Sequence, residues 1–214
     1  MSQATSVLVI DDDQFVNALV SDALSKNGFL VESALSLADA ATLIEEFNPN
    51  VLVTEIAFQS GEGILEFLER ATARDPELAI VALTNIFNPR LIGIERLEMM
   101  PIFAYLNKRI LKDYNLIIRA VNAATKREHS NELRHDKSEI SLGKKLSKTQ
   151  LEAIRLVSDG LTNQQIADLK CTTKRAVEVL LNRAYLAMNL DPDSMHVRVS
   201  AVRRYLEMTG LSRH

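Results

Sequence analysis

The run Ser6-Val-Leu-Val-Ile10, followed directly by Asp11-Asp12-Asp13, is the clearest indication of the fold in this sequence. An apolar run rich in β-branched residues predicts a strand. Because no polar residue alternates with the apolar ones, both faces of this strand are expected to be buried, which is typical of a parallel sheet covered by helices. The abrupt change to aspartate places negative charge at the carboxyl end of the strand.

The rest of the first half alternates between strands and helices in the same way. Apolar runs predict further strands at 29–34, 51–56, 79–84 and 102–106. Helical spacing and capping signals predict a helix that ends before Gly28, and helices over 36–47, 64–73, 89–98 and 111–124. This alternation predicts an α/β doubly wound five-stranded parallel sheet, which we expect to occupy residues 1–125.

Polar side chains stand at the carboxyl ends of four of these strands. They are Asp11, Asp12, Glu55, Thr84 and Lys108. In a doubly wound sheet the functional site lies at this edge, so we expect the five residues to converge. Carboxylate oxygens are ligands that suit Mg²⁺, and Asp11 and Asp12 are the candidate metal ligands. Taken singly, each residue could simply be a polar group that meets solvent, but five at matching ends favour a site.

The five residues resemble the acidic pocket of the receiver domain of bacterial response regulators, a CheY-like fold, over about residues 5–125. The resemblance implies that the paired acids help hold Mg²⁺ and that the carboxylate after the third strand accepts phosphate from a histidine kinase. It also implies that Thr84 and Lys108 contact the phosphoryl group. Tyr105 occupies the position of an aromatic residue that rotates when the family's domains are activated.

One substitution departs from this family, because Glu55 stands where the phosphoacceptor is Asp. Its carboxylate lies one methylene further out, which disturbs the in-line geometry of phosphoryl transfer. The stretches 58–60 and 99–102 also depart from the family's usual turns. We therefore expect an atypical receiver that binds Mg²⁺ at most weakly and requires no cofactor. Glu55 either partly mimics phosphoaspartate by reaching Thr84 and Lys108, or pairs quietly with Lys108.

Residues 126–145 are charged and poor in large apolar side chains, which predicts a linker whose end is a flexible tether. His129 and His135 lie within it, and both are expected to be solvated.

Residues 146–214 carry a second, helical pattern. Helices are predicted over 147–159, 163–169, 174–188 and from Ser194 to about Met208. A short helix, a tight turn and a longer basic helix are typical of a helix-turn-helix. The residues Leu146, Gly160-Leu-Thr-Asn163, Ile166-Ala167 and Val177 resemble the LuxR-type four-helix DNA-binding domain. The whole chain resembles the NarL/FixJ subfamily of response regulators.

The helix 174–188 has two distinct faces. Val177, Leu181, Ala184 and Met188 form the stripe expected to be buried. The opposite arc is the expected DNA face: Lys174, Arg175, Glu178, Val179, Asn182 and Arg183. Arg and Asn there can read bases or contact phosphates, whereas Glu178 stands where the family has Lys and repels phosphate. Leu180 is expected to pack in the core.

The charge balance separates the two halves, with a net charge of −8 over residues 1–125 and +5 over residues 126–214. The basic half favours double-stranded DNA as partner, bound at an inverted repeat by a homodimer. Val199, Val202 and Leu206 are the candidate dimer contacts that the resemblance implies. A partner protein at the receiver is a further expectation.

Other classes of protein are disfavoured. No apolar run approaches the length of a membrane span, no secretory signal is evident, and a single cysteine, Cys171, fits a reducing cytoplasm. The lead hypothesis is a transcriptional regulator that acts without aspartyl phosphorylation and is not an enzyme. The alternative is an adaptor or antagonist that binds no DNA and heterodimerises with another regulator.

Overall fold

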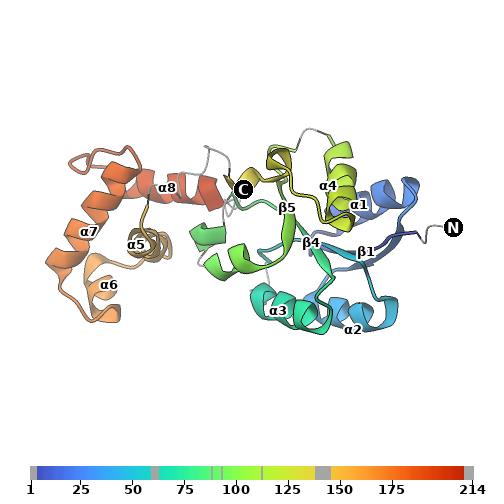
Figure 1. Cartoon of the computed structure of the whole chain (residues 1–214). Coiled ribbons are helices and arrows are strands. Elements are labelled where there is room, and N and C mark those ends of the chain that lie inside the picture. The colour runs from blue at the N-terminus through green and yellow to red at the C-terminus, as the bar shows by residue number, and fades with distance from the viewer. Residues whose placement is uncertain are drawn as a thin grey trace. The chain divides into compact units, whose positions relative to one another are not determined.

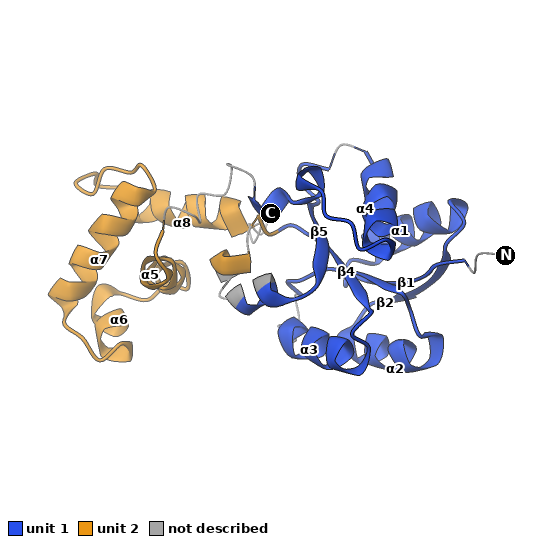
Figure 2. Cartoon of the chain, in the orientation of Figure 1, with its two compact units in different colours: residues 1–85, 96–137 blue, residues 86–95, 138–214 orange. Residues whose placement is uncertain are grey.

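The computed structural model describes residues 4–58, 63–87, 89–92, 94–111, 113–137 and 146–209. The chain divides into two compact units (Figure 2). The first unit consists of Met1–Asn85 and Arg96–Lys137, and the second of Ile86–Glu95 and Ser138–His214. Each unit is described by itself below. No helix among the described residues is long and apolar enough to span a membrane.

The first unit contains a parallel sheet in the order β2-β1-β3-β4-β5, which confirms the predicted fold class. Its strands are β1 (Ser6–Ile10), β2 (Leu30–Ala34), β3 (Val51–Thr54), β4 (Ala79–Thr84) and β5 (Ile102–Asn107). All residues of β3, β4 and β5 are buried, as continuous apolar runs require of strands covered on both faces. β2 and β5 form the two edges of the sheet.

Four α-helices cover the sheet, with α1 (Gln14–Lys26) and α4 (Asn115–Thr125) on one face and α2 (Leu37–Phe47) and α3 (Ile64–Arg74) on the other (Figure 1). Asp13 caps α1, since its side chain accepts the backbone N–H groups of Phe15 and Val16. α4 begins four residues later than predicted, because Asp113 accepts the N–H of Asn115 and fixes the first turn there.

The prediction of a single helix over residues 89–98 is wrong. Two 3₁₀ helices, η1 (Pro89–Ile92) and η2 (Glu95–Met99), replace it. η1 belongs to the second unit, where Leu91 is buried in the apolar core and its carbonyl accepts the Tyr205 hydroxyl at 2.7 Å. Tertiary packing of Leu91 thus overrides the local helical period.

The second unit contains four α-helices: α5 (Lys148–Ser158), α6 (Asn163–Leu169), α7 (Lys174–Ala187) and α8 (Val197–Thr209). Each contributes to one apolar core, with Ile154 from α5, Ile166 from α6, Leu181 from α7 and Tyr205 from α8. Capping boxes begin α5 and α6, and the Thr173 side chain caps α7. The four helices match those predicted, apart from shifts of a few residues at their ends.

The first part of the predicted linker is folded. His129 is exposed, as predicted, whereas His135 is partly buried, so the prediction of a solvated residue is wrong for His135. Two 3₁₀ helices, η3 (Asn131–Leu133) and η4 (His135–Lys137), follow α4. His129 stacks on Phe103 with ring centroids 5.0 Å apart, and His135 accepts the N–H of Asn107 at Nδ1. The predicted tether at 138–145 and most of the unusual turn at 58–60 lie outside the described residues.

Candidate functional site

The five polar residues predicted at the strand ends lie at one edge of the sheet. Two backbone hydrogen bonds extend the strand pairing by one residue there, from the Glu55 N–H to the Ile10 carbonyl and from the Lys108 N–H to the Thr84 carbonyl, each 2.8 Å long. These bonds align the ends of β1, β3, β4 and β5. We name Asp11, Glu55, Thr84 and Lys108, whose side chains are joined by hydrogen bonds, the acidic pocket.

The Glu55 carboxylate is buried, 4% exposed, and fully engaged. Its Oε1 accepts the Thr84 hydroxyl and the backbone N–H groups of Ile56 and Ala57, the latter two at 2.7 and 3.1 Å. Its Oε2 accepts the Lys108 ammonium at 2.8 Å. Both oxygens therefore have partners within the protein.

Lys108 joins the two buried carboxylates of the pocket. Its Nζ lies 2.6 Å from Asp11 Oδ2 and 2.8 Å from Glu55 Oε2. Burial opposes the charge of this ammonium, yet the fields of Glu55 and Asp11 outweigh it and raise the pKa of Lys108 above its ordinary value. Burial raises the pKa of Asp11, although Lys108 acts in the opposite direction.

These residues do not fit a metal ion as arranged. The Lys108 ammonium lies where a cation would meet Asp11 and Glu55, and Asp12 is partly exposed beside them. Among the described residues, no three His, Cys, Asp or Glu side chains converge with the geometry of a metal site. Mg²⁺ would have to displace Lys108 from both carboxylates.

Tyr105 of β5 is buried, 1% exposed. The charges of Glu55 in the acidic pocket and of Asp136, which the sequence did not mark as functional, both act on it. Burial, followed by the charges of Asp136 and Glu55, raises its pKa well above the ordinary value of 10.0. Asp136 belongs to a segment, residues 128–137, that we name the strap. The strap's one buried apolar residue, Leu133, was the only sequence signal that this charged stretch is folded.

The second unit presents the expected DNA face on α7. All six of its residues are exposed, and Lys174 Nζ lies 4.0 Å from Glu178 Oε1. The predicted stripe on the opposite side is buried, and Leu180 packs partly buried against the same core. The structure does not test DNA contact, so these assignments remain predictions.

The candidate dimer residues on α8 differ in their surroundings. Val199 is 68% exposed, whereas Val202 and Leu206 are partly buried against the core of their own unit. Val199 is therefore the residue of the three that offers most apolar surface to a partner.

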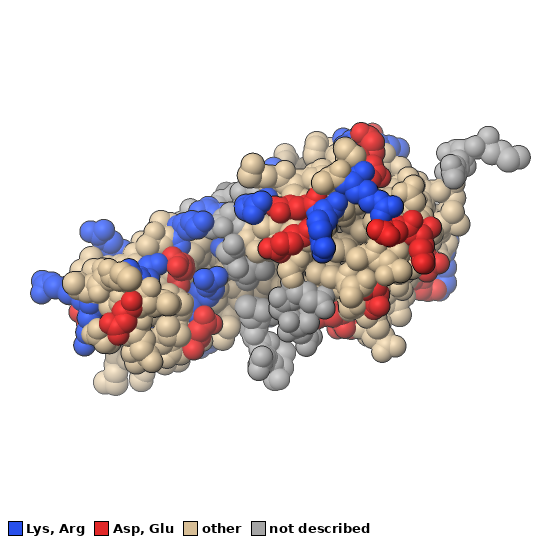
Figure 3. All heavy atoms as spheres, turned by 90° about the horizontal axis from the view of Figure 1, so that it is seen from below, with Lys and Arg blue, Asp and Glu red and all other residues tan. Residues whose placement is uncertain are grey.

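Charge on the second unit is mixed. In the view of Figure 3, Lys and Arg side chains project from the outer end of this unit, with Asp and Glu side chains among them.

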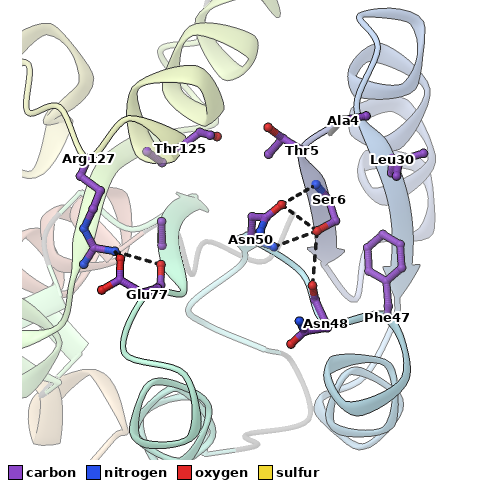
Figure 4. A pocket seen from close by; sticks show the side chains of 12 residues that line it. Ala4, Thr5, Ser6, Leu30, Phe47, Asn48, Asn50, Glu77, Thr125 and Arg127 are labelled. Carbon is purple, nitrogen blue, oxygen red and sulfur yellow. Dashed lines mark hydrogen bonds and ion pairs between the residues drawn. The ribbon is translucent and has the colours of Figure 1, made fainter. Parts of the chain in front are cut away.

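A pocket of about 810 Å³ lies at the opposite edge of the sheet, at the amino ends of the strands (Figure 4). Its polar side chains bond to one another: Ser6 Oγ donates to Asn50 Oδ1 at 2.9 Å, and Arg127 pairs with Glu77 at 2.9 Å. The acidic pocket, where buried charges are concentrated, is the stronger candidate site.

Residues 7–122 match the family of response regulator receiver domains. Two curated relatives are the photosynthetic apparatus regulatory proteins RegA of Cereibacter sphaeroides and of Rhodobacter capsulatus, each 32% identical over 80 residues. These matches cover 37% of this chain and 43% of the relatives, less than half of their length.

Solved structures of RcsB resemble the chain over nearly its whole length. The two-component response regulator RcsB in complex with DNA matches 96% of this chain and 99% of its own, with a TM-score of 0.64 and 17% identity. RcsB from Salmonella enterica serovar Typhimurium, bound to a promoter in the presence of the phosphomimetic BeF3⁻, matches 95% and 98%, with a TM-score of 0.57 and 19% identity. At such identities the likeness shows a common fold.

Proposed function

The chain belongs to the response regulator receiver family, and from this premise we propose that it is a DNA-binding transcriptional regulator whose receiver acts without aspartyl phosphorylation. The observation that carries this proposal is the closed acidic pocket, in which both carboxylate oxygens of Glu55 already have partners; Glu55 is the residue that we assign to the phosphoacceptor position. Lys108 and Thr84 already bind its carboxylate. We expect the protein to be cytoplasmic and active as a homodimer.

The pocket is unsuited to conventional phosphoryl transfer. That reaction depends on an aligned nucleophile and on cations that neutralise the transferred group. Here Glu55 Oε1 has three hydrogen-bond donors and Oε2 faces Lys108, so neither oxygen is poised for attack. The cation of this pocket is Lys108, which already contacts both Asp11 and Glu55.

Glu55 also satisfies the groups that the family uses to sense phosphate. The Thr84 hydroxyl and the Lys108 ammonium both bind the unmodified carboxylate. A carboxylate carries one negative charge and two oxygens, whereas an acyl phosphate carries nearly two charges and three terminal oxygens. Its contact with the Thr84 hydroxyl supports partial mimicry, whereas its contact with Lys108 is common to both expectations for Glu55.

The second unit supplies the DNA contact in this proposal. α6 and α7 form a helix-turn-helix, and the exposed face of α7 carries Lys174, Arg175 and Arg183. Residues 138–214, which make up most of the second unit, carry 12 Lys and Arg and 8 Asp and Glu, and their net charge of +4 favours a polyanionic partner. RcsB, which shares the fold, has been solved bound to DNA. A dimer would bind an inverted repeat, since the symmetry of the site mirrors that of the protein.

Incubation with acetyl phosphate and Mg²⁺, followed by intact mass measurement, tests the receiver. We expect no phosphoryl adduct on the natural chain and unchanged DNA affinity. The matched variant Glu55→Asp shortens the side chain by one methylene and should gain an adduct. An adduct on the natural chain at Glu55 would contradict phosphorylation-independent action.

An adaptor that binds no DNA is the alternative, and the exposed anion of Glu178 on the α7 face favours it. If the natural chain fails to bind duplex DNA at low salt and Glu178→Lys creates binding, the adaptor is supported. Binding by the natural chain excludes it.

A further inference from the structure

We propose that the strap, residues 128–137, is a latch on the β5 edge of the receiver and that its docking is coupled to the charge of the acidic pocket. The inference concerns the first unit alone and goes beyond DNA binding. It holds whichever molecule the second unit contacts.

The strap occupies the open side of an edge strand. Its Arg134 pairs with Tyr105 in a parallel bridge, and Arg134 Nη1 donates to the Ile102 carbonyl at 3.1 Å. Further along, the Asn107 N–H donates to His135 Nδ1 at 2.9 Å. Backbone groups of an edge strand need such partners, and the strap supplies them along the length of β5.

An ion pair inside the strap fixes its shape. Arg134 Nε and Nη2 donate to Asp136 Oδ1 and Oδ2 at 2.9 and 2.7 Å, which is a two-pronged contact. The side chains of Arg134 and Asp136 are only 15% and 7% exposed. A buried pair of this kind resists opening, because the loss of either partner leaves the other charge uncompensated.

Further contacts hold the beginning of the strap. His129 stacks on Phe103 of β5, and Leu133 is 3% exposed in the core of the receiver. Glu132 also pairs with Arg119 of α4, with atoms 3.0 and 2.5 Å apart, but this pair is exposed and contributes little to the docking. The strap is thus a docked element of the first unit.

Two routes connect this element with the acidic pocket. Tyr105 lies between them, close enough for the charges of both Glu55 and Asp136 to act on its phenol. In addition, the strap holds the backbone of Asn107, and the next residue, Lys108, is held by Glu55 and Asp11. The carboxyl end of β5 is therefore held by the strap at Asn107 and by the acidic pocket at Lys108. Loss of either set of contacts weakens the other.

Release of the strap would lengthen the connection to the second unit, which the chain enters directly after Lys137. Ten residues in extended form span about 33 Å. In this proposal the charge of the acidic pocket determines how long a connection joins the receiver to the second unit.

Hydrogen exchange of the full-length protein, without DNA or phosphodonor, tests the coupling. Glu55→Gln removes the pocket charge, and we expect backbone amides of residues 131–137 to exchange at least about tenfold faster while those of β1 are unchanged. Asp136→Asn should accelerate the same amides. Glu132→Gln, which alters an exposed pair on the same segment, is the matched control and should change exchange less than about threefold.

Coupling between two sites must be reciprocal, so Asp136→Asn should also raise the acylation rate of the Lys108 amine. Fast strap exchange in Asp136→Asn together with unchanged exchange in Glu55→Gln would overturn the proposal. If Glu55→Gln unfolds the receiver, shown by fast exchange in β1, then Thr84→Val decides by the same criterion. Because DNA is absent from these assays, their failure leaves the proposed function standing.

Discussion

Glu55 Oε2 lies 2.8 Å from Lys108 Nζ, although the two residues are 53 positions apart in the sequence. The same ammonium lies 2.6 Å from Asp11 Oδ2. The pocket therefore holds two buried carboxylates around a cation that the chain itself provides. Within this pocket Lys108 takes a place between two acids that a metal ion could otherwise occupy.

Replacing that cation should destabilise the receiver. Lys108→Met leaves Asp11 and Glu55 buried without their common partner, and breaking a buried pair costs about 3–5 kcal/mol. The free energy of unfolding in urea measures this loss. Lys26→Met, which breaks the exposed Lys26–Asp22 pair, is the control and should cost less than about 1 kcal/mol. A similar small loss in both variants would show that the pocket pairing contributes nothing to stability.

Reversing the charge of Glu178 should strengthen DNA binding. Glu178→Lys replaces an exposed anion on the α7 face with a cation, so the affinity for duplex DNA should rise about tenfold and depend more steeply on salt. Glu207→Lys makes the same charge change on exposed α8 and serves as the control. Equal gains in the two variants, measured by fluorescence anisotropy at two salt concentrations, would assign the effect to net charge rather than to the α7 face.

Arg198 of α8 should be needed to position the helix-turn-helix. Its guanidinium donates to the Leu161 carbonyl and, at 2.9 Å, to Asn163 Oδ1 at the start of α6. Lysine lacks the planar fork by which Nη1 and Nη2 of Arg198 reach the two acceptors, so Arg198→Lys should lower the free energy of unfolding by about 1–3 kcal/mol and weaken DNA binding although the charge is kept. Arg203→Lys, at an exposed site, should change neither quantity. Wild-type affinity in Arg198→Lys would refute this role.

The strap should weaken in mild acid because of His135. Burial lowers the pKa of His135 below its ordinary value of 6.5, while Asp136 acts in the opposite direction. Neutral Nδ1 accepts the Asn107 N–H, and a protonated nitrogen cannot. Since the folded pKa lies below the unfolded one, this contribution to stability is complete above pH 6.5 and is lost as the pH falls through the folded pKa.

Urea unfolding at several pH values between about 7.5 and 5 checks this prediction. His135→Gln should lose less stability across this window than the natural chain does. The control is His196→Gln, because His196 is exposed, and it should follow the natural chain. An identical pH dependence in His135→Gln and the natural chain would rule out His135 as the titrating group.

The acidic pocket was predictable because each of its residues stands at the carboxyl end of a strand that an apolar run marks. Asp11 comes after an uninterrupted apolar run, and the parallel sheet brings Glu55, Thr84 and Lys108 to the same edge. The buried stripe of α7 was predictable for a similar reason, since its period of 3.6 residues marks one face of one helix. In both cases local pattern and tertiary structure agree.

The segments whose structure was predicted wrongly are those that depend on contacts distant in the sequence. Leu91 joins the core of the second unit, so η1 follows the packing of α5 and α8 and not its own helical period. Arg134 and Asp136 appear in the sequence as ordinary charges of a linker, yet they are buried because β5 has an open edge. Neither fact is encoded in the spacing of nearby residues.

Selection of the untreated full-length protein against a random pool of duplex DNA, at two salt concentrations, tests the central claim most directly. No phosphodonor is added to the protein in this assay. We predict enrichment of an inverted repeat with half-sites about one helical turn apart, and steep weakening at the higher salt. Absence of any enriched sequence, even at the lower salt, would contradict a DNA-binding regulator that needs no phosphate.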